Sequence, residues 1–142
     1  MRIIRWFMVA GVAAVGLGLF AACGDDDDSE AADDLKLTDG DNGKAVTVAV
    51  QGTLTVVLVS NATTGYSWRV SGDLPGILEQ QGEPVYATPP ATASPVVGAA
   101  GTETFTFRAV QKGDGTLKLE YVRPFETGVP PAQTFEVTVS VE

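Results

Sequence analysis

Alternation of apolar and polar side chains is the feature that most constrains how this chain can fold. In the segment 134–141, polar residues alternate with four apolar ones, Phe135, Val137, Val139 and Val141. The segments 102–110 and 116–123 show the same period of two. Because successive side chains of a β-strand point to opposite faces of a sheet, this period predicts strands with one buried face. Burial stabilises each inward side chain by about 1.5–3 kcal/mol.

Three earlier segments also predict strands, at 44–50, 53–60 and 66–71, with Gln51-Gly52 joining the first two. Turn residues recur about every eight to twelve positions, a spacing typical of sandwiches. No stretch has a convincing helical stripe of apolar residues. The sequence therefore predicts an all-β fold, an immunoglobulin-like antiparallel β-sandwich of about seven strands.

Some details of the sandwich follow from turn chemistry. The Lys-Gly-Asp-Gly run at 112–115 predicts a hairpin between its flanking strands. The stretch before Thr102 is rich in Pro, Gly and Ala and is predicted to be mostly loop, because proline lacks the donor of a central strand. Trp68 is predicted to cover the interior. Alternate connections emerge at the same end, so loops 61–65 and 124–132 are expected to be neighbours, joined by 98–101 if the proline-rich stretch forms a short edge strand.

The chain begins with a segment typical of exported proteins. Arg2 and Arg5 precede an apolar run at 6–22, which is short for the roughly 20 residues of a spanning helix, and 1–22 is predicted to be a signal peptide. The residues before Cys23 resemble a bacterial lipobox. This implies that Cys23 is lipidated and anchors the protein to the outer face of a bacterial cell membrane or outer membrane. An ordinary cleaved signal peptide and an uncleaved anchor are the alternatives, and both also place the domain outside the cell.

The segment after Cys23 is strongly acidic. Residues 24–34 include seven acidic side chains and no basic one, a composition that does not fold by itself. We therefore expect a lipidated N-terminus and disordered tether at 23–38, followed by one folded domain at 39–142. The run 39–43 begins like a calcium loop but lacks the glutamate expected at the twelfth position, so it is predicted to be a turn.

Missing residue types exclude most catalytic chemistry. The chain has no histidine, and Cys23 is its only cysteine, which excludes Ser/His, Cys/His and histidine–metal sites. A hydrolase would need paired carboxylates, and the acidic residues of the domain show no such grouping. We therefore predict neither an enzyme nor a cofactor or metal. The net charge is -9, and -11 without the two leader arginines, so no nucleic acid partner is expected.

Three short segments fall between the predicted strands. They are Asn61-Ala62-Thr63-Thr64-Gly65-Tyr66, Gly98-Ala99-Ala100-Gly101 and Arg123-Pro124-Phe125. Gly65 permits a turn and a close approach of the backbone to a partner, and Phe125 after a rigid proline is a candidate interface anchor. The alternatives are an ordinary Asn/Thr/Gly turn for the first segment and a core aromatic at a strand end for Phe125.

Taken together and in this order, the three segments resemble the binding loops of chagasin-type cysteine protease inhibitors. In that family, an Asn-Pro-Thr-Thr-Gly-Tyr/Phe loop precedes a strand tryptophan, a Gly-x-Gly-Gly-like loop follows, and Arg-Pro-Trp/Phe comes after a tyrosine-bearing strand. This chain departs from the pattern at Ala62, in place of proline, and at Ala100, in place of glycine. The resemblance covers approximately residues 40–142.

The resemblance implies a reversible inhibitor of papain-like cysteine proteases that blocks the active-site cleft with three loops and is not turned over. Thr63 and Thr64 would then lie at the protease's catalytic Cys/His pair. The residues assigned to protease binding are Asn61, Thr63, Thr64, Gly65, Tyr66, Gly98, Ala99, Ala100, Gly101, Arg123, Pro124 and Phe125. We expect a monomer. The alternative is a non-inhibitory adhesion module of a surface lipoprotein, which competition with a substrate-like peptide would distinguish.

Overall fold

The computed structural model describes residues 31–88 and 98–142. The leader, the lipidation site predicted at Cys23 and most of the acidic segment lie outside these residues. The strands are β1 (Ala32–Thr38), β2 (Ala45–Ser60), β3 (Ser67–Val70), β4 (Leu78–Gln80), β5 (Val85–Ala87), β6 (Gly101–Ala109), β7 (Gly113–Val122) and β8 (Gln133–Val141), and the single-turn 3-10 helices are η1 (Asp39–Asp41) and η2 (Ala62–Thr64). Among the described residues, no helix has the length and apolar character to cross a membrane.

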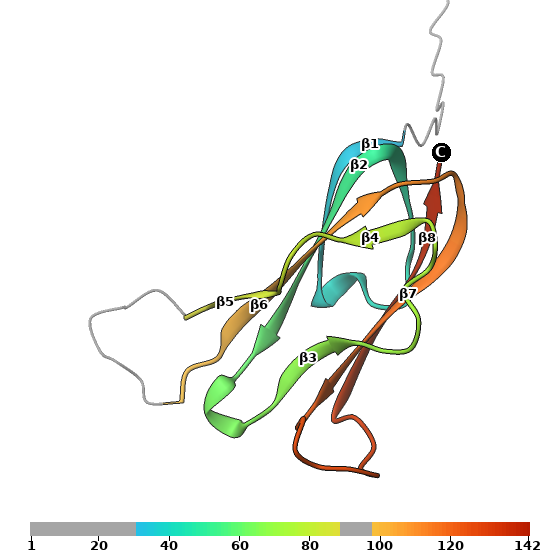
Figure 1. The fold of residues 1–142 in the computed structure, drawn as a ribbon. Coiled ribbons are helices and arrows are strands. Elements are labelled where there is room, and N and C mark those ends of the chain that lie inside the picture. Colours follow the sequence, from blue (N-terminus) through green and yellow to red (C-terminus); the bar gives the residue numbers. More distant parts are fainter. Residues whose placement is uncertain (1–30, 89–97) are drawn as a thin grey trace, which may run out of the picture.

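The strands form one curled sheet, the two halves of which face each other across a shared core (Figure 1). The strand order is β3-β7-β8-β2-β6-β4, with β1 also paired to β2 and β5 to β6. Strand β2 belongs to both halves, because its first part pairs with β8 and its second part pairs with β6. The prediction of an all-β, immunoglobulin-like fold is confirmed.

The two strands predicted at 44–50 and 53–60 are the two legs of β2, and they run in opposite directions on either side of Gln51-Gly52. Gln51 has a φ of 71°, and a Cβ on Gly52 would lie 2.6 Å from the carbonyl oxygen of Asp33 and 2.7 Å from that of Ala49. Only glycine fits this close approach of backbone to backbone. The turn signal in the sequence therefore marks a reversal of chain direction that carries β2 from one half of the sheet to the other.

The hairpin predicted between 102–110 and 116–123 is wrong. β6 pairs with β2, β4 and β5, whereas β7 pairs with β3 and β8. The predicted buried faces are nevertheless correct, since Phe105 and Phe107 share one core with Leu117 and Leu119. The two strands supply opposite halves of that core. The sandwich is also not antiparallel throughout, because the β1–β2 and β2–β8 pairs are parallel.

The folded domain begins earlier than predicted, because residues 32–38 of the expected tether form β1. Leu37 is buried and Leu35 packs against the core, while β1 pairs with β2 as far as Thr38. The turn predicted at 39–43 contains η1. There the Lys44 ammonium and the backbone of Thr38 donate hydrogen bonds to Asp41 and hold the pKa of its carboxyl below the usual value.

One apolar core fills the space between the two halves of the sheet. Trp68 is 4% exposed within it, as predicted. The core side chains of the long strands are Val48, Leu54, Val56, Leu58, Phe105, Phe107, Ala109, Leu117, Leu119, Tyr121, Phe135, Val137, Val139 and Val141.

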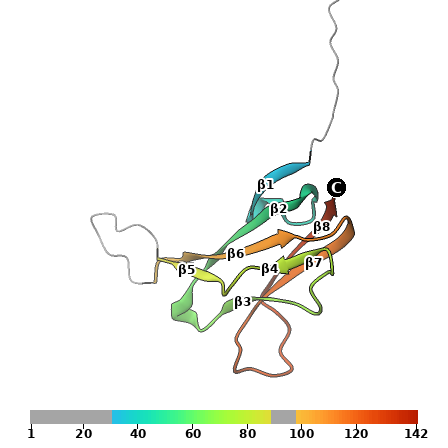
Figure 2. The ribbon, with the colours of Figure 1, turned by 45° about the horizontal axis from the view of Figure 1, so that its top comes forward.

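The strand ends determine where the loops emerge. Ser60 at the end of β2 pairs with Gly101 at the start of β6, and Ser67 at the start of β3 pairs with Val122 at the end of β7. The connection from β7 to β8 also emerges at this end of the strands. Loop 1 (61–66), loop 2 (98–100) and loop 3 (123–132) therefore meet at one end, the three-loop end (Figures 1 and 2).

Candidate functional site

Loop 1 is a closed turn held by its own polar groups. The Asn61 Oδ1 accepts hydrogen bonds from the backbone N–H of Thr63, at 3.1 Å, and from its hydroxyl, at 2.6 Å. The Thr64 hydroxyl donates to the Asn61 carbonyl at 2.7 Å. Gly65 ends the turn at a φ of 77°, a left-handed conformation that favours glycine. Thr63 and Thr64 are exposed at the tip of this turn.

Loop 2 is joined to loop 1 by a side-chain hydrogen bond. Asn61 Nδ2 donates to the Gly98 carbonyl at 3.0 Å, so one asparagine organises both loops. Ala99 is half-buried and Ala100 is exposed. Gly101, which the sequence assigned to this loop, is instead a buried residue of β6. A Cβ there would collide with the Ala87 carbonyl and the Tyr86 ring, so this glycine serves packing.

Loop 3 is joined to loop 1 by Arg123. Its Nε donates to the Thr64 carbonyl at 3.2 Å, and its Nη1 lies 3.1 Å from Glu126 Oε1. Phe125 is 73% exposed, which contradicts the alternative of a core aromatic. Its ring packs beside loop 1, because a Cβ on Gly65 would lie 3.2 Å from Phe125 Cε1. Pro124 is also exposed at the tip of the loop.

A cluster of aromatic rings supports loops 1 and 3 from the side of the core. The Arg123 guanidinium carbon lies 4.4 Å from the centroid of the Tyr66 ring, a cation–π geometry. The Tyr121 ring lies 5.1 Å from Tyr66 and 5.1 Å from Trp68, and its hydroxyl accepts from the Asn61 N–H at 2.9 Å. The structure thus places Tyr66, predicted to bind the protease, half-buried within the support of the loops.

A buried carboxylate ties together the strands beside loop 1. Glu103 is 7% exposed, and its oxygens accept from the Ser60 hydroxyl at 2.6 Å and from the Trp68 N–H at 2.9 Å. Sequence reasoning missed this residue. The signal was available, because Glu103 occupies an inward position in the alternation that contains Phe105 and Phe107.

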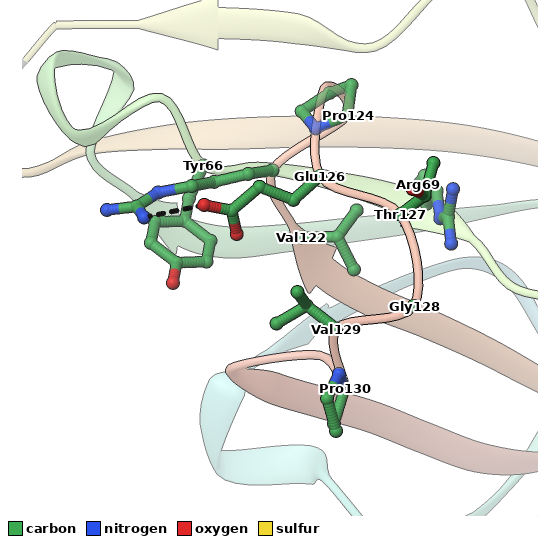
Figure 3. Close-up of a pocket in the computed structure, with 10 residues that line it drawn as sticks. Tyr66, Arg69, Val122, Pro124, Glu126, Thr127, Gly128, Val129 and Pro130 are labelled. Atoms are coloured by element: carbon green, nitrogen blue, oxygen red, sulfur yellow. Dashed lines mark hydrogen bonds and ion pairs between the residues drawn. The ribbon is translucent and has the colours of Figure 1, made fainter.

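A cavity of about 270 Å³ lies behind loop 3 (Figure 3). The rings of Tyr66 and Pro130 and the side chains of Val122 and Val129 form apolar parts of its wall, and the paired Arg123 and Glu126 also line it. The side chain of Arg69 lies at its far edge in this view. Loop 3 therefore leaves open space between itself and strands β3 and β7, and Arg123 and Phe125 join it to loop 1.

The chemistry of the three-loop end suits binding. Its exposed groups are backbone, threonine, alanine and an aromatic ring, which can fill a cleft in a partner. In the part of the chain that the structure describes, no three acidic side chains gather closely enough to hold a metal ion.

Comparison with known proteins points to one family. The profile of the chagasin family peptidase inhibitors, I42, matches residues 47–139. Chagasin of Trypanosoma cruzi is 33% identical over an alignment of 107 residues that covers 72% of this chain and 93% of chagasin. Amoebiasin-1 of Entamoeba histolytica is 28% identical over 108 residues, 76% of this chain and 100% of that protein. The crystal structure of EhICP2, a cysteine protease inhibitor of E. histolytica, shares the fold with a TM-score of 0.68 at 20% identity, covering 77% of this chain and 96% of its own.

The fold and the family match define a β-sandwich of the peptidase inhibitor class, with three loops meeting at one end. The chain belongs to the chagasin family of peptidase inhibitors. The resemblance inferred from three short motifs is therefore confirmed, and it places the chain in a family of inhibitors rather than enzymes.

Proposed function

We propose that this protein is a reversible, tight-binding inhibitor of papain-like cysteine proteases and that its three-loop end fills the active-site cleft. The observation that carries the proposal is the mutual bonding of the loops. The side chain of Asn61 donates a hydrogen bond to the Gly98 carbonyl, and that of Arg123 donates one to the Thr64 carbonyl. The Phe125 ring packs beside Gly65. The three motifs that resemble the family's binding loops thus form one surface. EhICP2, which shares the fold, is itself described as a cysteine protease inhibitor.

Loop 1 is the segment proposed to lie at the catalytic Cys/His pair. Its exposed Thr63 and Thr64 are small, and their hydroxyls are engaged within the loop, so the tip offers backbone and methyl groups. A peptide that pairs along a cleft is extended, whereas this turn would lose its hydrogen bonds on extension. The closed turn therefore supports inhibition without cleavage.

Loops 2 and 3 are proposed to bind on either side of loop 1. Ala99 and Ala100 allow the backbone of loop 2 to approach the substrate cleft. Phe125 is a rigid aromatic anchor, a residue type that commonly dominates interface energetics. Because the loops are bonded to one another before binding, little ordering cost remains on association.

The proposed location is the outer face of a bacterial membrane. Support comes from the apolar run at 6–22 and the lipobox-like residues before Cys23. Several acyl chains on Cys23 and its amine would hold the protein firmly, whereas a single chain binds only marginally. We propose a monomer in this setting, with one three-loop end per molecule.

Titration of residues 24–142 into papain, with a serine protease as control, tests the inhibitor proposal. This span retains β1, which a start at Leu35 would truncate. Tight, reversible inhibition of papain alone is expected. A Thr63→Arg/Thr64→Arg double variant should lose it, whereas Gln111→Arg at the opposite end should not. A folded protein that leaves several papain-like enzymes uninhibited at micromolar concentration would refute the proposal and favour an adhesion-type module.

A further inference from the structure

The N-terminal end of the described chain lies at the opposite end of the sandwich from the three loops. Ala32, the first residue of β1, pairs with Val48, and β1 then runs parallel to β2 toward the loops, reaching Val57 at Thr38. Val141, near the C-terminus, also pairs with Val48. Both ends of the domain therefore share one pole, here called the tether pole (Figures 1 and 2).

The distance between the two poles follows from strand geometry. From Ala32 to Thr38 the chain makes six residue steps, and β2 continues for three more from Val57 to Ser60. At about 3.3 Å per residue, these steps span roughly 30 Å. Loop 1 projects beyond Ser60, so the exposed threonines lie farther still from Ala32.

The sequence between Cys23 and Ala32 limits where an anchored domain can point. Eight residues, 24–31, separate them, so nine residue steps join the two, and at most about 3.6 Å per step gives a reach of roughly 32 Å. The reach of this segment is thus about equal to the distance between the two poles of the domain. A protease of about 200 residues has a radius of gyration of about 16 Å. No room therefore remains for such a protease between the three-loop end and the membrane.

Charge favours the same orientation. Acidic side chains occupy positions 25–28, 30, 33 and 34, and no basic residue lies among them. An anionic leaflet attracts basic segments and repels acidic ones. This acidic segment is therefore repelled by an anionic surface rather than drawn along it.

From these observations we infer that lipidated Cys23 presents the three-loop end away from the membrane, so that the protein captures soluble papain-like proteases arriving from the solvent side. This inference rests on the proposed inhibitory function and on lipidation of Cys23. It excludes, as a partner, a protease lying between the domain and the protein's own membrane. The anchor then concentrates the inhibitor at the surface without blocking its binding end.

Vesicle coupling tests the orientation. Residues 23–142, expressed without lipid, contain one thiol, so Cys23 can be coupled to maleimide lipid in preformed vesicles. Two Cys23→Ser variants move the attachment point. Glu142→Cys attaches at the tether pole, and Gln133→Cys, an exposed position at the start of β8 outside the three motifs, attaches at the three-loop end. Inhibition of soluble papain is compared before and after coupling.

We expect proteins coupled through Cys23 or Glu142→Cys to inhibit within about threefold of their uncoupled forms, and those coupled through Gln133→Cys to lose at least tenfold. A tenfold loss through Cys23, or no loss through Gln133→Cys, would overturn the orientation while leaving the inhibitory function intact. Failure of the uncoupled proteins to inhibit would instead overturn the proposed function, and this inference with it.

Discussion

Replacing Arg123 with methionine should weaken inhibition by releasing loop 3 from loop 1. The variant loses the bond from Nε to the Thr64 carbonyl, the ion pair with Glu126 and the contact with the Tyr66 ring. Methionine preserves much of the aliphatic length, so the substitution removes mainly the polar contacts. Loop 3 would then span the cavity behind it without its principal tie to loop 1.

The magnitude can be estimated contact by contact. A cation–π contact at an exposed site contributes about 0.5–1 kcal/mol. The ion pair, with side chains 35% and 33% exposed, contributes less than about 1 kcal/mol after solvent screening. The hydrogen bond from a charged donor adds about 1 kcal/mol in this exposed setting. If the contacts that hold loop 3 against loop 1 are weakened by about 2 kcal/mol, the fraction of molecules with the loops in the binding arrangement falls by up to about 30-fold. The affinity for the protease falls by the same factor.

The assay is the inhibition constant for papain, with Arg69→Met as the matched control. Arg69 lines the same cavity but has one ion pair, at 3.7 Å to Glu120, and its replacement should change inhibition less than threefold. Combining Arg123→Met with Tyr66→Leu tests whether the two residues stabilise loop 3 together. If they do, the double variant should lose less inhibition than the sum of the two single losses. A loss of inhibition below threefold for Arg123→Met, or equal losses for the two arginine variants, would refute the claim that Arg123 holds loop 3 against loop 1.

Four further predictions concern single residues. Phe125→Ala should weaken papain inhibition at least tenfold without lowering the melting temperature, because the ring is exposed; an unchanged inhibition constant would exclude it as an anchor. Gly101→Ala should destabilise the fold by about 1–3 kcal/mol in thermal melts, since the new Cβ meets the Ala87 carbonyl and the Tyr86 ring; a neutral melt would contradict this packing. Glu103→Leu should cost about 2–5 kcal/mol in urea unfolding, because the Ser60 hydroxyl and Trp68 N–H lose their buried acceptor, and Glu103→Gln should cost less. Lys44→Met should raise the pKa of Asp41 toward its usual value in an NMR titration; because that pKa is depressed on folding, the stability linked to it is present above the unfolded pKa and lost as pH falls through the folded one.

Local patterns in the sequence predicted much of the fold. Alternation identified the inward faces of β6, β7 and β8, because a period of two depends only on which face is buried. Alternation does not identify strand partners, and the glycine-rich turn between β6 and β7 predicts a hairpin although the two strands lie in opposite halves of the sheet. Strand β1 escaped prediction because Leu35 and Leu37 are its only large apolar residues in an acidic segment, and their burial depends on pairing with β2.

The candidate site was likewise predictable only in part. The loop motifs were visible because each is a run of neighbouring residues, and topology correctly predicted that the loops share an end. The connections between them were not visible. Arg123 contacts Thr64 and Tyr66 from a segment some sixty residues away, and Glu103 reaches Ser60 and Trp68. Such contacts exist only once the strands are aligned.

A site-specific disulfide would test the central claim most directly. The domain has no cysteine after Cys23, so Thr64→Cys in residues 24–142 introduces a single thiol at the tip of loop 1. If loop 1 lies at the catalytic cysteine of papain, mild oxidation should form a mixed disulfide between the two, because a disulfide requires Cβ atoms about 4 Å apart. Lys112→Cys at the opposite end should form none. Absence of the Thr64→Cys adduct, or an equal yield from Lys112→Cys, would contradict the placement of the three-loop end in the active-site cleft.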